Sequence, residues 1–280
     1  MNERQELLAT IIDYPDDDTP RLVFADWLEE HREVERAEFI RLQCAIARRF
    51  AVEPSVVDDP VMGEMWDRQT ELLKEYRGEW MREMPRGVET QFFRRGFVAG
   101  VRIHTEQWLD ASAELQSLTP LESVTFTHSP RHFTKLVKDE GIRRLSSLSF
   151  ASNGLSVQHM LFLTRTQGWP RLRSLTLSGN LLGASAANVL ATSKLAEQIE
   201  HLDFSNNPIG DEGLYVMASA PRLANLRTLQ LIGTRVGDLA VRAIIESPYL
   251  KRLHWFRVGD GISAATRNLL ESRFPGTSAF

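Results

Sequence analysis

Apolar residues in the second half of the chain recur in a fixed order. Two apolar residues stand three apart, a third follows two residues later, and an Asn comes three residues after that. Three stretches carry the whole pattern: Leu145-Leu148-Phe150-Asn153, Leu172-Leu175-Leu177-Asn180 and Ile199-Leu202-Phe204-Asn207. Their first residues are 27 apart. Because the centre alternates apolar and polar residues, the pattern predicts a short β-strand that buries one face in each stretch.

The same order extends in both directions with some decay. Downstream it gives Leu226-Leu229-Leu231 and then Leu250-Leu253-Trp255; upstream it gives Leu121-Val124-Phe126 and, more weakly, Val98-Val101-Ile103. The steps between first residues are 23 to 27, within the roughly 20–29 residues of a leucine-rich repeat. The sequence therefore predicts about seven such repeats over residues 96–275.

A helical stretch is expected after each strand. Asp211 and Asp238 can cap helix N-termini, and Pro221 and Pro248 follow where a helix should stop. One unit cannot bury its own apolar face, so neighbouring units must stack. We therefore expect an α/β fold: a right-handed leucine-rich-repeat solenoid with a parallel concave sheet and convex helices.

The segment from Leu202 to Leu214 resembles ribonuclease-inhibitor-type leucine-rich repeats. It contains Asn206-Asn207-Pro208-Ile209-Gly210-Asp211-Glu212-Gly213. The resemblance implies that the concave face binds protein partners.

The Asn of each full repeat has an expected structural role. Its short amide can bond backbone groups that the sharp turn after the strand leaves unpaired. We expect Asn153, Asn180 and Asn207 to form a ladder. Ser129, Thr234 and Val258 take the same position in other repeats, so the ladder should fray toward the ends.

Residues two, four and six positions after the first apolar residue should point away from the core, onto the concave face. In the middle repeats these are small hydroxyl residues and Ala, whereas the C-terminal third carries larger groups. The candidate partner-binding residues are His201, Asp203, Thr228, Gln230, Ile232, Arg252, His254 and Phe256. Alternatively, Ser and Thr simply fit exposed strand positions, and the face binds nothing tightly.

The first 50 residues read as three helices. Asn2 can cap Glu3–Ile12, and Thr19 can cap a second helix with Pro20 at its first position. We expect that second helix to bury Val23, Phe24, Trp27 and Leu28. The third carries apolar residues at steps of three or four from Val34 to Ala47.

This helical segment resembles the bacterial repeat-companion domain. The match runs through Asp16-Asp17-Asp18-Thr19-Pro20-Arg21-Leu22-Val23-Phe24-Ala25-Asp26-Trp27-Leu28-Glu29-Glu30-His31 and continues in Glu35-Arg36-Ala37-Glu38-Phe39-Ile40-Arg41-Leu42-Gln43. Arg32-Glu33 stands where the family has a Gly-Asp turn. The resemblance implies company with repeats and no known enzymatic activity.

The remaining segments complete the expected domain organisation. Residues 1–50 form the all-α companion domain, and residues 51–95 a helical linker that caps the N-terminal end of the solenoid. Within that linker we expect a loop over Glu53–Pro60, a helix over Glu64–Tyr76 that Gly78 ends, and a strand led by Phe92 and Phe93. Residues 276–280 form a C-terminal tail.

Composition narrows the compartment. No apolar run approaches the roughly 18 residues of a membrane-spanning helix, and the charged start does not resemble a signal peptide. Cys44 is the only cysteine. These features favour a reducing cytoplasm and exclude membrane binding. The net charge is −4, yet residues 1–60 hold 15 Asp/Glu against 7 Lys/Arg. We expect no nucleic-acid binding, because no strong basic stripe is evident.

The function expected from these features is non-enzymatic. No nucleotide-binding loop, metal motif or nucleophile arrangement is present, so we expect no catalytic residues, cofactor or metal. The leading hypothesis is a module that binds an unidentified protein on the concave face. Alternatively, the acidic companion domain of a structural or regulatory subunit makes the main contact. A third alternative is a hydrolase that uses His201, Asp203 and His254.

Overall fold

The computed structural model describes residues 2–52, 59–166 and 168–276, and in these ranges the chain is a mixed α/β protein. Its strands follow one another in chain order from β1 to β8. The chain divides into two compact units. The first unit holds Met1–Arg102 and Ala111–Glu122, and the second holds Ile103–Asp110 and Ser123–Phe280.

Four helices and a β-hairpin build most of the first unit. The helices are α1 (Glu3–Asp13), α2 (Thr19–Glu30), α3 (Val34–Val52) and α4 (Pro60–Trp80), and the hairpin strands are β1 (Glu89–Arg94) and β2 (Phe97–His104). Helix α5 (Thr105–Leu118) begins in the second unit and ends in the first. Ile11, Phe24, Leu28 and Ile40 of α1–α3 form one buried cluster with Phe97 of β2. The helices are therefore held to the hairpin by a shared apolar core.

The hairpin turn also contacts α3 closely. Arg95 and Gly96 both have positive φ, 49° and 87°, which suits a two-residue turn between twisted strands. The Gly96 N–H donates to Gln43 Oε1 over 2.6 Å, and a Cβ on Gly96 would lie 2.7 Å from Ile40 Cα. Only a glycine fits this turn against the helix.

Three details of the helical segment differ from the sequence prediction. Helix α2 has Asp18, not Thr19, as its N-cap residue, and Val23 is 49% exposed while Arg21 is buried instead. Gly78 lies inside α4 and does not end it. The last turn of α4 is held by Trp80, whose ring lies tilted against Phe39 with the ring centres 4.7 Å apart, and this packing offsets the roughly 1 kcal/mol cost of a helical glycine. Of the predicted loop Glu53–Pro60, residues 53–58 lie outside the described residues, as do 277–280 of the predicted tail.

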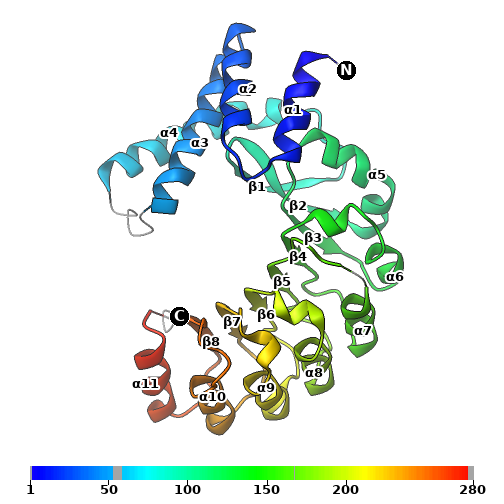
Figure 1. Cartoon of the computed structure of the whole chain (residues 1–280), viewed down its shortest axis with the longest axis vertical. Coiled ribbons are helices and arrows are strands. Elements are labelled where there is room, and N and C mark those ends of the chain that lie inside the picture. The colour runs from blue at the N-terminus through cyan, green and yellow to red at the C-terminus, as the bar shows by residue number, and fades with distance from the viewer. Residues whose placement is uncertain (1, 53–58, 167, 277–280) are drawn as a thin grey trace. The chain divides into compact units, whose positions relative to one another are not determined.

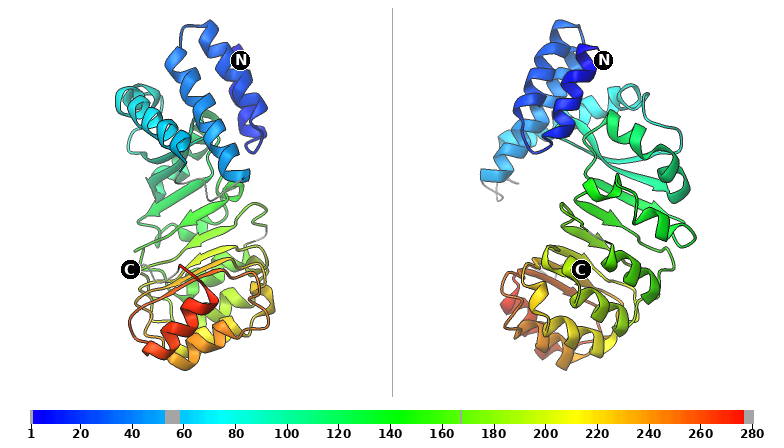
Figure 2. Two further views of the ribbon diagram at one scale, coloured as in Figure 1. Left: turned by 90° about the vertical axis from the view of Figure 1, so that its left-hand side faces the viewer. Right: turned by 45° about the vertical axis from the view of Figure 1, so that its right-hand side comes forward.

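The second unit repeats a strand followed by a helix. Its parallel strands are β3 (Ser123–Thr127), β4 (Ser147–Ser149), β5 (Ser174–Thr176), β6 (His201–Asp203), β7 (Thr228–Leu231) and β8 (Trp255–Val258). The helices are α6 (Phe133–Leu136), α7 (Val157–Arg165), α8 (Ala184–Ala191), α9 (Gly210–Ala218), α10 (Asp238–Ile245) and α11 (Ala264–Arg273), with short 3-10 turns at Ile142–Arg144, Lys194–Glu197 and Pro221–Leu223. These helices lie on one side of the strands, and the other side of the strands carries no helix of this unit (Figures 1 and 2).

Leucines of successive repeats stack directly on one another. Leu148, Leu175, Leu202 and Leu229 are register partners along the sheet, and each is at most 2% exposed. Residues on either side of them in each strand are more exposed. The alternation predicted from sequence is therefore the alternation between the core and the helix-free side.

The Asn residues bond the backbone of neighbouring repeats. Asn180 Oδ1 accepts from the N–H groups of Asn153 and Leu155 at 3.1 and 2.9 Å, and its Nδ2 donates to the carbonyl of Phe150 at 2.9 Å. Asn207 Oδ1 accepts from the N–H of Leu182 at 3.1 Å. The residue before the Asn position has positive φ in five successive repeats: His128, Ser152, Gly179, Asn206 and Gly233. The sharp turn thus recurs in five repeats, and in the three central ones an Asn amide follows it and bonds the backbone.

The last repeat differs from the sequence prediction by three residues. Strand β8 pairs with β7 through Thr228↔Trp255 and Leu229↔Phe256. The repeat therefore begins at Leu253, which follows Leu226 by the same step as in the full repeats, and not at Leu250. Its apolar order is Leu253-Phe256-Val258, so Val258 is a strand residue rather than the counterpart of Asn207.

Candidate functional site on the open face of the sheet

The helix-free side of strands β3–β8 carries two regular rows of side chains. We call this surface the open face and define it by the residues that pair across the strands. The first row is Ser123, Ser147, Ser174, His201, Thr228 and Trp255, and the second row is Thr125, Ser149, Thr176, Asp203, Gln230 and Arg257. The rows follow from the repeat spacing, because equal spacing puts equivalent residues side by side.

The N-terminal half of the open face is uniform. All six row residues of β3–β5 are Ser or Thr, and each is partly exposed. Short hydroxyl side chains make this part of the surface flat and polar, and they offer no bulky group to insert into a partner. This part of the face therefore has little to distinguish one partner from another.

The C-terminal half of the open face is varied. His201 is exposed, and its Nδ1 shares a hydrogen bond of 3.0 Å with Thr228 Oγ1. Partial burial lowers the pKa of His201 below its ordinary value, because the charged imidazolium is less well solvated there. The Asp203 carboxylate accepts from the N–H of Ser205 at 2.8 Å. The two side chains thus use separate partners.

Ile232 lies beyond these rows and is partly exposed. Its N–H donates to Ser205 Oγ over 3.2 Å. Ser205 is 6% exposed, and by this bond its hydroxyl serves the backbone of the next repeat rather than a partner.

Phe256 was expected on this face, and that expectation is wrong. The Phe256 side chain is 0% exposed and its ring lies edge-on to Phe274, 5.9 Å away, in the core. Side chains alternate between the two faces of a strand. Starting the repeat at Leu250, three positions too early, therefore assigns Phe256 to the open face and its two neighbours to the core. Trp255 and Arg257 take the open-face positions, and the Arg257 guanidinium lies 5.9 Å from the centre of the Trp255 ring.

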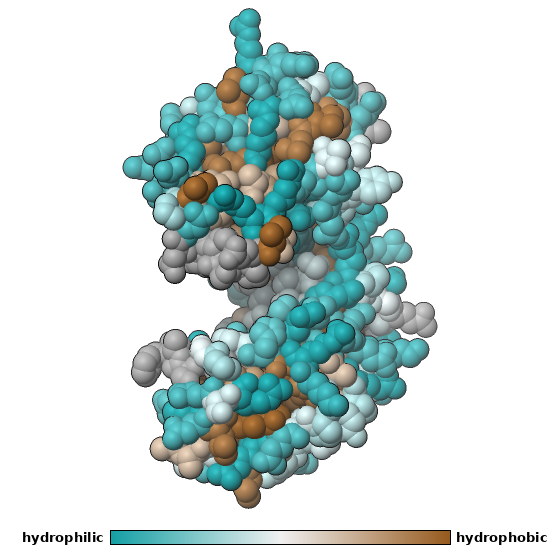
Figure 3. Space-filling model, turned by 60° about the vertical axis from the view of Figure 1, so that its left-hand side comes forward, coloured by the Kyte–Doolittle hydropathy of each residue, from teal (hydrophilic) through white to brown (hydrophobic). Residues whose placement is uncertain are grey.

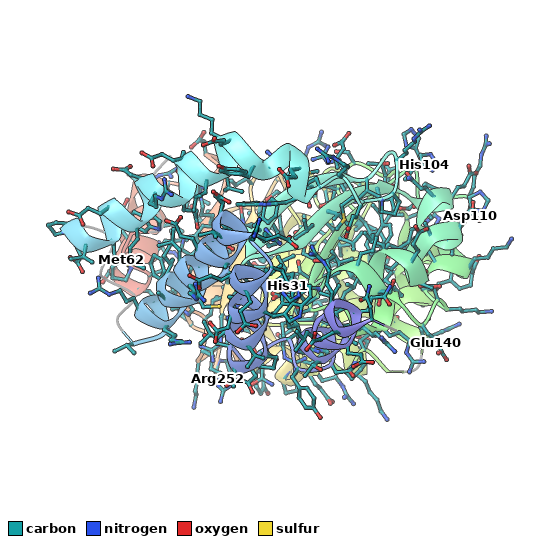
Figure 4. All side chains as sticks on the ribbon, turned by 90° about the horizontal axis from the view of Figure 1, so that it is seen from above. His31, Met62, His104, Asp110, Glu140 and Arg252 are labelled. Atoms are coloured by element: carbon teal, nitrogen blue, oxygen red, sulfur yellow. The ribbon has the colours of Figure 1, made fainter. Side chains whose placement is uncertain are left out.

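Arg252 and His254 also leave the rows once the frame is corrected. Both are exposed, but they flank Leu253 at the start of the last repeat, before β8 begins. Arg252 Nη1 donates to Asn225 Oδ1 at 2.9 Å (Arg252 is labelled in Figure 4). A search for the constant repeat step from Leu226, rather than for the nearest leucine, would have found Trp255 and Arg257.

Other potentially reactive side chains have structural roles. Burial raises the pKa of the Cys44 thiol to about 12, so it remains protonated at neutral pH. Ser156 and His159 share a 3.0 Å contact, but they form a capping box at the start of α7. Among the described residues, no group of three His, Cys, Asp or Glu side chains is placed to hold a metal ion.

The molecular surface is mostly hydrophilic with discrete apolar patches on the side shown in Figure 3. Within the described ranges, no helix combines the length and the apolarity needed to cross a bilayer. The most exposed apolar residues of the repeats, Leu181 and Leu239, lie on different repeats. Single exposed apolar residues are ordinary on protein surfaces and mark no site by themselves.

Comparison with known proteins identifies one repeat directly. Residues 199–218, which contain β6 and α9, match a family model described as Leucine Rich repeat. No curated protein matches the chain significantly. The chain therefore contains a leucine-rich repeat, and the register of β4–β8 relates the neighbouring strands to it at one constant step.

Proposed function

We propose that this chain is a non-enzymatic protein-interaction module whose leucine-rich repeats form a right-handed solenoid and bind a protein partner on the open face. Leucine-rich repeats generally mediate contacts between proteins, and stacked repeats present an extended surface for them. The observation that carries the proposal is the change along the open face, from uniform hydroxyl rows to the varied side chains of β6–β8. We propose ribonuclease-inhibitor-type repeats on the strength of the constant repeat step and the helix of eight to ten residues that follows each strand from β4 to β8.

The proposed anchors are Trp255 and Arg257, together with His201, Asp203 and Gln230. Trp and Arg are the residue types that most often dominate the binding energy of interfaces, because they bury large areas and still form polar contacts. Both are partly exposed on a strand, which holds their backbone fixed. The hydroxyl rows then serve as a smooth surface that excludes water without adding strong contacts.

We further propose that residues 1–50 form a companion domain. The support is local: α1–α3 pack as a compact trio around Phe24, Leu28 and Ile40, and the residues that carry the resemblance line this core. Its surface is rich in carboxylates that pair with arginines, as Arg41 does with Asp26 and Glu29 at 2.7 and 2.6 Å. The alternative, in which this acidic segment makes the main contact with the partner, remains a distinct second proposal.

The absence of catalysis, cofactor, metal, nucleic acid and membrane contact is part of the proposal. The His201 imidazole bonds a threonine hydroxyl and Asp203 bonds the backbone, so no described contact joins them as a base and its orienting carboxylate. A cytoplasmic location is proposed from the single buried cysteine.

The test is affinity capture from native lysate with chemical cross-linking. Trp255→Ala with Arg257→Ala should lose the partners that the unmodified chain captures. A matched control, Phe162→Ala with Arg165→Ala on α7, also removes an exposed aromatic residue and an arginine and should retain them. Equal capture by both double variants would place the binding surface elsewhere, and loss on replacing Glu6 and Glu30 by Gln would favour the acidic helical segment.

A further inference from the structure

The positive charge of the second unit is concentrated where its strands begin. The unit holds 18 Lys/Arg and 13 Asp/Glu, an excess of five cations. Five repeats start at residues 145, 172, 199, 226 and 253. In each of them we count the charged residues at three positions: the two before the first apolar residue and the one after it. These positions hold seven Lys/Arg and two Asp/Glu, which is the whole excess. The rest of the unit is neutral, with 11 of each.

We call these positions the strand-start edge, and the structure brings them together. The position after the first apolar residue is hydrogen-bonded from repeat to repeat: the N–H of Glu200 donates to the carbonyl of Arg173, and the N–H of Arg227 to that of Glu200, at 2.8 and 2.7 Å. Their side chains are joined as well, because Glu200 pairs with both Arg173 and Arg227. The position one before the first apolar residue is also joined between repeats, because Arg252 Nη1 donates to Asn225 Oδ1.

Two basic clusters lie on this edge. The first comprises Arg143 and Arg144 of one repeat with Arg171 and Arg173 of the next. Arg143 Nε donates to the carbonyl of Gly168 at 2.9 Å, which fixes it to the loop of the following repeat. Arg144 and Arg171 are exposed.

The second cluster comprises Arg227, Lys251 and Arg252. Lys251 and Arg252 are exposed, and the Arg227 side chain is 45% exposed. Arg252 donates to a neutral amide, so its charge is not neutralised by that contact. This cluster lies beside Trp255, the proposed anchor of the open face.

An acidic repeat separates the two clusters. Glu200 lies between Arg173 and Arg227, at 3.7 and 2.8 Å from their Nε atoms, and Glu197 pairs with Arg222. One carboxylate shared by two guanidiniums leaves net positive charge on both sides. The edge therefore carries two basic clusters separated by a repeat whose carboxylates are already paired with arginines.

We propose that the strand-start edge binds a partner protein through an extended segment in which two acidic pairs flank a short non-acidic spacer. The proposal rests on the proposed protein-binding function and names the chemistry of the partner. Parallel strands lie about 4.8 Å apart, so five repeats span about 19 Å, which a seven-residue extended peptide covers at about 3.3 Å per residue. Its central residue then meets Glu200.

The same pattern disfavours a nucleic acid. A phosphate backbone carries its charge uniformly, so part of it would lie over the middle of the edge, where Glu197 and Glu200 already neutralise arginines and no free cation is offered to it. A protein segment can place an uncharged or basic residue opposite the middle repeat, whereas a nucleic acid has a phosphate at every nucleotide.

Fluorescence anisotropy on the full chain at about 20 mM salt tests this proposal, since low ionic strength leaves surface charges unscreened. The probe is fluorescein-labelled Glu-Glu-Gly-Lys-Gly-Glu-Glu. A shuffled peptide of the same composition, Gly-Lys-Gly-Glu-Glu-Glu-Glu, and a 15-residue oligodeoxythymidine are the comparison probes. We expect the patterned peptide to bind at least about fivefold more tightly than the shuffled one, and raised salt to weaken it.

The diagnostic variant is Arg144→Glu with Arg252→Glu, one charge reversal in each cluster, and it should weaken the patterned peptide by about tenfold or more. The control, Lys135→Glu with Arg165→Glu on α6 and α7, makes the same change in net charge and should leave binding within about twofold. Equal loss in both variants, equal binding of both peptides, tighter binding of the oligonucleotide, or no binding of the patterned peptide would each overturn the proposal. The capture experiment with Trp255 and Arg257 is independent of this result, so failure of either proposal can be told from failure of the other.

Discussion

The leucine-rich repeats and the helical segment solve the same packing problem by different means. In the repeats, one set of contacts recurs at a constant step: stacked leucines, a left-handed turn residue and an amide that bonds the turn backbone. In the helical segment each contact is made once, as with Gly96 against Ile40 or Arg36 over the Trp80 ring at 4.7 Å. A recurring contact can be read from spacing, whereas a single contact depends on residues that are distant in sequence.

The largest expected effect tests the corrected frame of the last repeat. Phe256→Ala should lower the free energy of unfolding by about 3–5 kcal/mol, because it opens a cavity in the core beside Phe274. Trp255→Ala should cost no more than about 1 kcal/mol, because Trp255 is partly exposed. Urea unfolding followed by circular dichroism measures both. If Trp255 proved the costlier residue, the frame that starts at Leu250 would be correct after all.

A second substitution tests the recurring amide. Asn180→Ala should lower the free energy of unfolding by about 3 kcal/mol, because it leaves two backbone N–H groups and three backbone carbonyls without this partner. Asn188→Ala, on the exposed side of α8 in the same repeat, is the control and should change little. Similar losses for the two variants would mean that the ladder adds nothing beyond ordinary polar contacts.

Two glycine substitutions separate the cost of a close contact from the cost of backbone strain alone. Gly96→Ala should cost about 2–4 kcal/mol, because its φ is +87° and the new Cβ would meet the backbone of α3. Gly154→Ala, in the repeats, should cost about 1 kcal/mol, since its φ is +66° but no atom lies within 4 Å of the new Cβ. Thermal unfolding of the two variants gives the comparison, and equal costs would show that α3 gives way without penalty.

The ion pairs of the helical segment should contribute least. Arg41→Ala removes contacts with Asp26 and Glu29, whose side chains are 69% and 53% exposed, and should cost less than about 1 kcal/mol. The difference from the unmodified chain should shrink further in about 0.5 M salt. A salt-independent loss above that value would show that the network is more than a surface feature.

His201 gives the open face a small pH dependence. Its folded-state pKa lies below the ordinary value near 6.5, so the unfolded chain takes up the proton first as pH falls. Its contribution to stability is therefore present above about pH 6.5 and is lost on acidification below it. NMR titration should give a midpoint below 6.5, and His201→Gln should flatten the stability profile in that window. A midpoint above 6.5 would mean that Glu200 outweighs desolvation at this site.

Periodicity explains where sequence reasoning worked and where it failed. The strands at Leu148, Leu175, Leu202 and Leu229 were predictable because each repeat states the pattern again. At the C-terminal end, Leu250 and Leu253 both fit the first apolar position of the repeat. A repeat that starts at Leu250 assigns Phe256 to the open face, whereas one that starts at Leu253 assigns it to the core. In the helical segment, helical spacing alone assigned Val23 to the core, while the structure buries Arg21, whose Nη1 donates to the carbonyl of Asp17 at 2.7 Å.

The sequence by itself determined the repeat, its period, the residues of its core and the amides of its turns, because stacked identical units force equivalent residues into equivalent surroundings. For the last repeat the sequence offered two frames, starting at Leu250 or at Leu253, and the strand pairing decided between them and with it the exposure of Trp255 and Arg257. The tertiary structure also decided that arginines and lysines scattered along the sequence from Arg143 to Arg252 lie on one strand-start edge around Glu200. Register and charge clustering depend on which strands pair, and pairing is a property of the folded sheet rather than of any one repeat.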